Sequence, residues 1–384
     1  MNNIRLGIIG LGNIGRYHAE YLLKGEVPRC ELVAVCARNP DSLQAFNSLK
    51  IFSDGEALIH SGEIDAAIVS TPHYQHAPLG IAAIEAGIHA MIEKPIAAHK
   101  ADAQRLINAH LVHPRVIFGG MFQQRVEPRY LKIRELINAG DLGQIVRVNW
   151  INTDWYRTEA YFGSADWRGT WKGEGGGVLL NQCLHNLDML QWLCGMPARV
   201  RGFCQLGRFH TIEVEDQVTA YMEWQNGAIG TFTGSTGETP GTNRLEIVGT
   251  RGRVILEHNR LTFTSLSEDM AKFSASAKQG FVAPDATTTE IPIENAPAPH
   301  ATIMRDFVAA ILDGQPLLVP GEEGIHSLEL ANAMVYSSML GQTLELPMSG
   351  SAWETKLDEL IASSTITKKI TAVNADDFVS SFRR

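Results

Sequence analysis

Three glycines near the start of the chain, Gly10, Gly12 and Gly15, have the spacing G-x-G-x-x-G. In this spacing the first glycine permits a tight turn, the second lets the backbone approach a pyrophosphate, and the third lets a helix pack closely on a strand. Asn13 and Ile14 complete the run and open a helix whose free N–H groups and dipole attract phosphate. The run predicts a dinucleotide site; the alternative is a packing turn without a ligand.

The tip of the second expected strand bears on which dinucleotide binds. Proteins that bind NAD usually place Asp or Glu there, to accept hydrogen bonds from the ribose hydroxyls. Here Ala37 stands at the tip and Arg38 follows. A 2′-phosphate would meet no carboxylate, and an arginine can pair with it. We therefore expect NAD(H) or NADP(H) as cofactor, with NADP(H) favoured; the alternative is that Arg38 is a solvated surface charge.

The elements that must hold these residues alternate between short apolar strands and helices. Strands are expected at Ile4–Ile9, Glu31–Cys36, Ile64–Ser70, His89–Ile92 and Val116–Gly119, and helices at Asn13–Lys24, Asp41–Ser48, Gln75–Ala86 and His99–His110. Continuous apolar strands that alternate with helices are typical of a parallel sheet covered on both faces.

The rhythm changes near residue 124, where strands joined by short turns such as Asn226-Gly227 indicate an antiparallel sheet. Strands are expected at Gln144–Asn152, Asp216–Trp224, Ala228–Ser235, Asn243–Gly249, Arg253–His258 and Arg260–Ser265, and helices at Pro128–Asn138, Val178–Cys194, Ile303–Leu312 and Trp353–Ser363. Residues 268–300 are expected to form a long loop, because they are rich in Ala, Thr and Pro.

Two further motifs follow the glycine run later in the sequence. Glu93-Lys94-Pro95 follows the fourth strand, and Gly175-Gly176-Gly177 precedes Asn181 and His185 in a G-G-G-x-x-x-(D/N)-x-x-x-H pattern. In this order, the motifs resemble the Gfo/Idh/MocA family, the relatives of glucose–fructose oxidoreductase and inositol dehydrogenase, from Ile4 to about Leu346. The resemblance implies an α/β chain: a Rossmann domain at 1–123, a substrate-binding and oligomerisation domain with a large, mostly antiparallel sheet at 124–346, and an extension at 347–384.

The resemblance also implies site residues. The expected cofactor contacts beyond the glycine run and the strand tip are Ser70, Thr71, Pro72, His73, His76, Glu93, Lys94, Gln123, Trp167 and Arg168. Lys94 would reach both cofactor and substrate, and His185 would act as acid and base near an alcohol. Both suit that chemistry, because oxidising an alcohol needs a base at its oxygen and a donor to steady the alkoxide. Asn181 departs from the aspartate of many relatives and is expected to position the substrate.

A loop between the motifs is unusually rich in aromatic and charged residues, and Trp155, Tyr156 and Arg157 lie in it. Sugars present apolar faces to aromatic rings and hydroxyls to polar groups. We expect these three residues and Arg125 to bind substrate, although some of the aromatics would pack the domain interface. The predicted substrate is therefore a sugar, glycoside or cyclitol with a secondary alcohol, and the predicted enzyme is an NAD(P)-dependent oxidoreductase.

Two alternatives stay open at this point: a glycosidase that uses bound NAD in an oxidation–elimination–reduction cycle, and an inactive regulator that senses dinucleotide or sugar. No metal site is expected, because the 13 histidines are scattered and lack H-x-x-x-H spacing. The net charge of −9 argues against nucleic acid as a partner. With five cysteines, no C-x-x-C pair and no long apolar run, we expect a cytoplasmic protein without membrane contact. The family resemblance implies a homodimer or homotetramer that forms through the large sheet.

Overall fold

The computed structural model describes residues 3–38, 43, 45–294, 299–368 and 370. Its first part is a parallel sheet of six strands in the order β3 (Lys50–Phe52), β2 (Cys30–Cys36), β1 (Ile4–Ile9), β4 (Ala66–Val69), β5 (His89–Ile92), β6 (Phe118–Gly120). This order is that of the Rossmann fold, and it reverses direction between β1 and β4, where such folds bind dinucleotides. The expected parallel sheet is confirmed.

Four helices of this part flank the sheet: α1 (Asn13–Leu23), α2 (Gly55–Ile59), α3 (His76–Glu85) and α4 (Lys100–Val112). The strands are apolar on both faces because both faces are covered; every residue of β4 is buried. The expected helix at Asp41–Ser48 lies partly outside the described residues.

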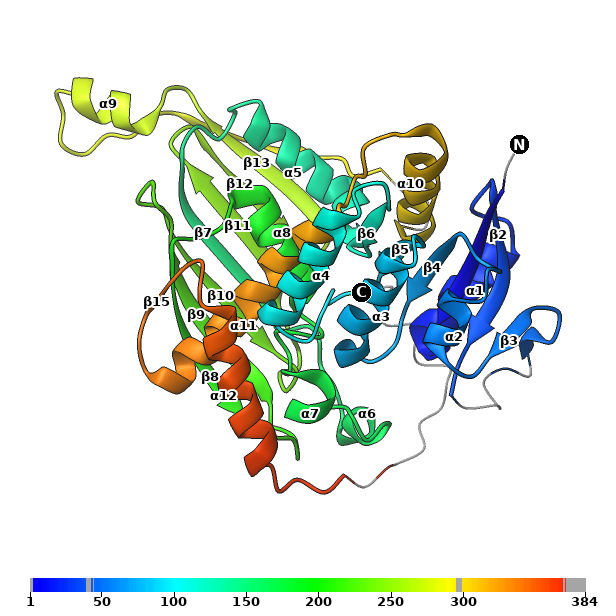
Figure 1. Ribbon diagram of the computed structural model, residues 1–384. Helices are drawn as coiled ribbons and strands as arrows, with labels where there is room; N and C mark the ends of the chain where they lie inside the picture. The colour runs from blue at the N-terminus through cyan, green and yellow to red at the C-terminus, as the bar shows by residue number, and fades with distance from the viewer. Residues whose placement is uncertain (1–2, 39–42, 44, 295–298, 369, 371–384) are drawn as a thin grey trace.

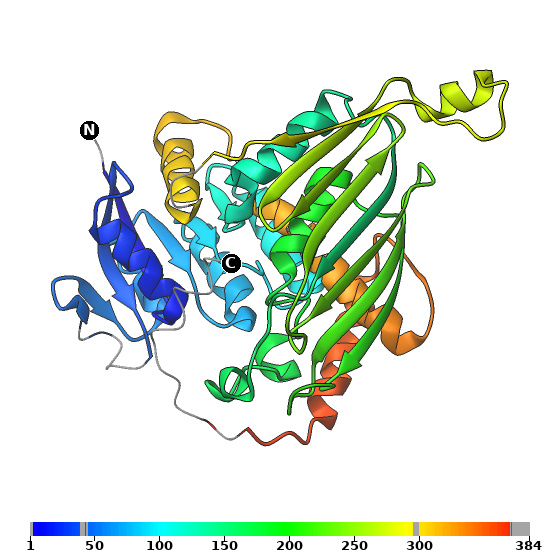
Figure 2. The same cartoon turned by 180° about the vertical axis from the view of Figure 1, so that it is seen from behind.

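The second part is a nine-stranded sheet (Figures 1 and 2). Its order is β14 (Ala286–Ile291), β13 (Arg260–Leu266), β12 (Gly252–Glu257), β11 (Asn243–Gly249), β7 (Ile145–Asn152), β10 (Ile229–Ser235), β9 (Glu215–Glu223), β8 (Arg199–Leu206), β15 (Leu344–Glu345). Every neighbouring pair is antiparallel except β7 and β10. The expected large, mostly antiparallel sheet is therefore confirmed.

Helices cover one face of this sheet. Both views place α4, α8 (Leu184–Cys194) and α11 (Gly324–Leu340) between the two sheets. The helix α11 lies close on β8 because Gly202 has no side chain and donates its N–H to Ser337 Oγ at 3.0 Å. The remaining helices are α5 (Pro128–Asn138), α6 (Glu159–Gly163), α7 (Trp171–Glu174), α9 (Met270–Ser276), α10 (Pro299–Asp313) and α12 (Gly350–Ser363), with short 3₁₀ turns η2 (His73–Gln75), η3 (Gln123–Val126) and η4 (Gly321–Glu323).

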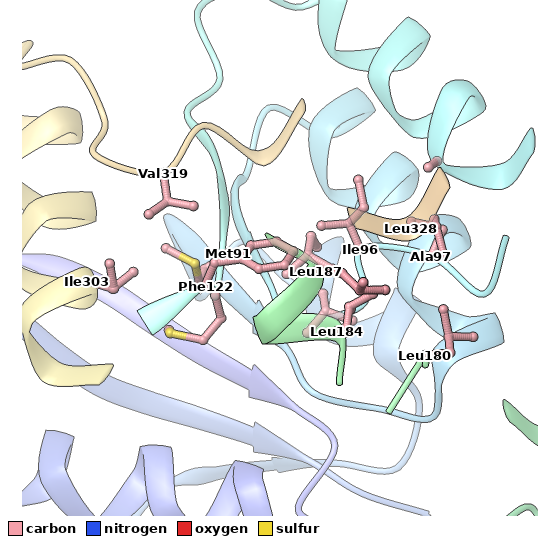
Figure 3. Packing of buried hydrophobic residues seen from close by; sticks show 14 of the residues in the cluster. Met91, Ile96, Ala97, Phe122, Leu180, Leu184, Leu187, Ile303, Val319 and Leu328 are labelled. Atoms are coloured by element: carbon pink, nitrogen blue, oxygen red, sulfur yellow. The ribbon is translucent and has the colours of Figure 1, made fainter. Parts of the chain in front are cut away.

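The C-terminal helices return to the Rossmann sheet and complete its core. Figure 3 shows Ile303 of α10 and Val319 beside Met91 of β5 and Phe122, in one cluster with Leu187 of α8. Beyond them, α12 packs against α4. The two sheets are thus joined by a continuous apolar core. No helix among the described residues is both long and apolar enough to cross a membrane.

Two expectations about elements were wrong, and the helix α11 was missed. The expected loop at 268–300 contains α9 and the edge strand β14. The expected helix Val178–Cys194 begins only at Leu184, because the preceding residues form turns whose N–H groups bond a side chain of β9. The helix α11 was not predicted, since it is buried on nearly all sides and lacks the polar face of an amphipathic helix.

Candidate active site

The glycine turn lies where β1 ends and α1 begins. Gly10 has φ +99°, and a Cβ there would stand 2.7 Å from the carbonyl oxygen of Ser70. A Cβ on Gly15 would overlap the carbonyl oxygen of Gly10, whereas one on Gly12 would meet nothing within 4 Å. No side chain caps α1, so its first N–H groups face open space beside Gly12. The turn therefore has the shape that a pyrophosphate needs.

The neighbouring loops of the Rossmann sheet converge on this turn. Ser70 Oγ donates to the carbonyl of Gly10 at 2.8 Å. The ring of His76 lies between the carbonyls of Pro95 and Thr71, at 2.6 and 2.7 Å. This histidine thus ties the loop after β4, which includes Pro72, to the loop after β5.

The predicted cofactor residues of the second part come to the same loops. The rings of Trp167 and His73 are 6.1 Å apart. The Arg168 guanidinium lies 4.5 Å from the centre of the Trp167 ring and donates to the Tyr161 hydroxyl at 2.7 Å. Burial lowers the pKa of His73 to about 3, so this ring is neutral and its Nδ1 donates to the carbonyl of Glu174 at 2.9 Å. The structure therefore brings these expected contacts together.

Arg38 lies apart from this cluster, at the tip of β2. It is exposed and forms no ion pair with the described part of the chain. Ala37 donates its N–H to the carbonyl of Phe52 in β3. The strand tip thus offers a cation and no carboxylate side chain at positions 37 and 38.

Glu93 and Lys94 follow β5. Glu93 is buried and accepts hydrogen bonds from His18 Nε2 at 2.8 Å and from the Lys94 N–H at 3.1 Å. Burial works to raise the pKa of Glu93, but the His18 hydrogen bond and charge outweigh it, and the pKa is lowered. Lys94 precedes a cis-proline and donates its Nζ to the carbonyl of Asn181 at 2.9 Å. Lys94 is thereby fixed between the two parts of the chain.

His185 stands in the first turn of α8 and is 7% exposed. Burial, aided by the charge of Lys94, holds the pKa of His185 well below its usual value. Its Nε2 lies 3.2 Å from Nε2 of Gln123, and its Nδ1 is buried without a partner among the described residues. His185 is therefore a neutral imidazole, able to accept a proton.

Arg125 was expected to bind substrate, but the structure places it in a buried ion pair. Its guanidinium is about 1% exposed and donates to Asp188 at 2.6 and 2.8 Å, and it also pairs with Glu323. Asp188 lies three residues after His185 in α8, and its carboxylate is engaged by Arg125. This ion pair joins η3, α8 and η4.

The aromatic loop forms one wall near Asn181. The Arg157 guanidinium lies 5.3 Å from the centre of the Trp155 ring and 5.0 Å from that of Tyr161. Tyr156 is 42% exposed, and Trp155 Nε1 is buried without a partner among the described residues. The loop thus combines ring faces with donors, as a sugar site requires.

Two residues of this wall were missed as site residues in the sequence. Glu174 is 2% exposed and accepts hydrogen bonds from Asn181 Nδ2 and the Gly169 N–H, each at 2.5 Å. Tyr161 contacts Arg168 and the amides of Asn181 and Gln182 through its hydroxyl. The signal for Glu174 was its place directly before the three glycines.

The orphaned polar atoms of the described chain fit a bound ligand. Eight buried side-chain atoms have no partner there, and four belong to predicted site residues: Thr71, Gln123, Trp155 and His185. Folded proteins pair nearly all such atoms, so exceptions at predicted site residues are groups that a bound ligand would satisfy. Together with the open Gly12 turn, this supports a nicotinamide cofactor and a polar substrate.

A possible metal cluster lies elsewhere, where ligand atoms of His99, Asp102 and Glu354 come within 4.8 Å of one another. Arg105 donates to both carboxylates at 2.5–3.0 Å, so a cation already holds these acids. The absence of a metal site stays a prediction.

The Rossmann sheet and the open glycine turn define the class of nicotinamide-dependent oxidoreductases. Two family models match the chain: the NAD-binding Rossmann fold of the oxidoreductase family at residues 4–118, and the GFO/IDH/MocA C-terminal domain at 130–255. The chain belongs to the Gfo/Idh/MocA oxidoreductase family, and the resemblance read from the sequence is confirmed.

Curated relatives and solved structures match most of the chain. It is 24% identical to myo-inositol 2-dehydrogenase of Thermotoga maritima over 349 residues, covering 86% of this chain and 95% of that one. It is 26% identical to levoglucosan dehydrogenase of Pseudarthrobacter phenanthrenivorans, covering 68% and 75%. The WlbA dehydrogenase of Chromobacterium violaceum, solved with NADH and UDP-GlcNAcA, is 26% identical with a TM-score of 0.78, covering 91% and 97%.

Proposed function

We propose that the chain transfers a hydride between a nicotinamide cofactor and a secondary alcohol of a sugar, glycoside or cyclitol. The observation that carries the proposal is the link from Lys94, at the end of β5, to Asn181, four residues before a buried neutral His185. Three relatives with this family's fold act on, or are solved with, ring-shaped polyols and sugars, which supports the substrate class.

The chain's own residues account for the proton and charge steps. When bound, the nicotinamide supplies the hydride acceptor or donor. In the oxidising direction, His185 accepts the hydroxyl proton as the substrate carbon gives up its hydride and a carbonyl forms. The Lys94 amine donates a hydrogen bond to the same oxygen and steadies its developing negative charge. Trp155 and Tyr161 cover the substrate face and reduce access of water.

The experiment is a screen of myo-inositol, levoglucosan and related ring alcohols with NAD⁺ and NADP⁺, read as absorbance of the reduced nicotinamide. Turnover is expected, and Lys94→Ala and His185→Ala should each abolish most of it. Near-normal turnover in both variants contradicts the assignment. Release of nitrophenol from nitrophenyl glycosides without net cofactor reduction would instead identify the redox-cycling glycosidase, and cofactor binding without any turnover would identify the sensor.

We propose NADP(H) as the preferred cofactor, because Arg38 is exposed and unpaired within the described chain while Ala37 replaces the usual acid. Arg38→Ala is expected to lower kcat/KM for NADP⁺ by roughly tenfold, the worth of a charge-assisted hydrogen bond, and to leave the value for NAD⁺ nearly unchanged. Steady-state kinetics with both cofactors measures this. A strong preference of the wild type for NAD⁺ contradicts the proposal.

The partner and compartment are proposals as well. We propose a homodimer or homotetramer that forms through the open face of the nine-stranded sheet. Ile151, Phe203, Tyr221 and Ile229 are 37–57% exposed on that face. Residence in the cytoplasm is supported by the five cysteines, all of which are free thiols.

A further inference from the structure

Glu174 is a buried carboxylate with which no cation of the described residues forms an ion pair. It ends α7, is 2% exposed and forms no salt bridge with the described residues. Neutral donors hold both oxygens: the Gly169 N–H bonds one and the Asn181 amide bonds the other, each at 2.5 Å. An ionised carboxylate in such a place is costly unless a nearby charge compensates it.

Burial raises the pKa of Glu174, and the charge of Arg168 opposes that shift. A second cation, the Lys94 amine, lies on the other side of Asn181. This asparagine directs its side-chain amide to Glu174 and its backbone carbonyl to Lys94 Nζ, at 2.9 Å. One residue therefore separates the amine from the carboxylate and holds each in place. Burial lowers the pKa of Lys94, and Glu93 and Glu174 act against that shift.

We propose that Glu174 is a positioning carboxylate of the catalytic amine: it orients Asn181 and supplies the negative charge that the Lys94 ammonium faces through that residue. The inference rests on the proposed function only for what the amine does to substrate. Glu174 itself acts through Asn181 and is not assigned a contact with the reacting atoms.

No other group around Lys94 and Glu174 is proposed to supply the negative charge that Glu174 provides. Glu93 is already engaged by His18 and by the Lys94 N–H. The remaining titratable and charged groups near Lys94 or Glu174 are cations, neutral histidines and one buried acid: Arg157, Arg168, Lys368, His73, His76, His185, His300 and Glu215. Removing Glu174 thus leaves Lys94 between Glu93 and two arginines, which favours the uncharged amine.

The test measures the reactivity of Lys94 in the full-length protein. Acetic anhydride modifies only the uncharged amine, and mass spectrometry gives the extent of acetylation of each lysine across a pH series. In Glu174→Gln, acetylation of Lys94 near neutral pH is expected to rise by roughly three- to tenfold, because a lost opposite charge increases the uncharged fraction. Glu159→Gln, which removes an exposed acid of α6, is the matched control and should leave Lys94 unchanged.

A charge-swap variant separates charge from shape. In Glu174→Gln with Asn181→Asp, the carboxylate moves across the hydrogen bond, and Lys94 acetylation is expected to return to within about twofold of wild type. Unchanged reactivity in folded Glu174→Gln overturns the proposal. If that variant does not fold, the swap variant decides: wild-type reactivity supports the proposal, and failure to fold or raised reactivity overturns it. Acetylation needs no substrate, so a wild type without turnover contradicts only the proposed function.

Discussion

Burial lowers the pKa of both the Lys94 amine and the His185 imidazole, but their neighbouring charges differ. His185 meets mainly apolar surroundings and the positive charge of Lys94, so its pKa is far below the usual value and it stays neutral near pH 7. Burial also lowers the pKa of Lys94, but the carboxylates of Glu93 and Glu174 oppose this shift. In the proposed mechanism, His185 is the proton acceptor and Lys94 is the hydrogen-bond donor.

The substitution His185→Asn tests that assignment. Asparagine keeps a polar group beside Gln123 but cannot take a proton, so kcat is expected to fall by about 10²–10⁴-fold, the usual worth of a general base. Affinity for NADH, measured by fluorescence titration, should change little because His185 is assigned to the alcohol. A kcat within a few-fold of wild type would show that another group accepts the proton.

The family resemblance, not spacing alone, selected Lys94, Asn181 and His185 as site residues. The structure joins Lys94 to Asn181. The partner of Asp188 could not be predicted, because Arg125 reaches it from a turn 63 positions earlier in the chain. Burial of Glu174 likewise depends on tertiary packing that no local pattern reveals.

The β1–α1 turn contains two glycines that differ in what surrounds them. Gly12→Ala should leave the Tm of the cofactor-free protein unchanged, because its Cβ has open space. It should weaken NADH binding roughly tenfold or more, since a methyl forced against a ligand costs about 1–3 kcal/mol. Gly15→Ala should lower the Tm instead, because its Cβ would overlap the Gly10 carbonyl. Thermal unfolding and fluorescence titration measure both; equal NADH affinity in Gly12→Ala and wild type would contradict a phosphate site.

Glu215 on β9 holds the turn before α8, and its ionisation predicts a pH effect on stability. Its carboxylate accepts the N–H groups of Gly177 and Leu179, yet burial raises its pKa to about 7. Between about pH 4.5 and 7 the folded chain keeps this proton while the unfolded chain loses it, so the free energy of unfolding falls as pH rises. Well above pH 7 Glu215 is ionised in both states, and the free energy of unfolding no longer falls for this reason.

Glu215→Gln removes this contribution. Relative to wild type, the variant should become progressively more stable as pH rises from 4.5 to 7, measured by urea unfolding at several pH values. Glu159→Gln, an exposed acid, should show no such trend. A stability difference between Glu215→Gln and wild type that is independent of pH would mean that Glu215 ionises normally in the folded chain.

Local patterns predicted elements well where turn residues bound a continuous or periodic apolar run. The expected bounds of β1, β5, α5 and β11 agree with the structure to the residue. Local patterns failed where tertiary contacts determine the secondary structure. The strand β14 is largely exposed along its length and pairs only at the sheet edge. The helix α11 is enclosed by β8, α8 and α4. Neither has the alternation that marks a helix or strand in sequence.

The open face of the large sheet predicts how copies associate. Phe203→Glu with Tyr221→Glu would place charges in the middle of a face that is proposed to be buried, and we expect the assembly to dissociate to monomers, as measured by light scattering after size-exclusion chromatography. Leu111→Glu, at a 67% exposed position of α4, is the control and should not change the mass. A wild type that is monomeric at all concentrations contradicts this interface.

The return of α10 and the residues before α11 to the Rossmann sheet has a consequence for biosynthesis. Met91 and Phe122 are covered by Ile303 and Val319, and Pro320 bridges to Gly119. The ribosome therefore makes the whole nucleotide-binding part of the chain long before it makes the segments that cover this apolar surface. Until those segments are made, the nucleotide-binding part exposes an apolar surface, to which chaperones can bind.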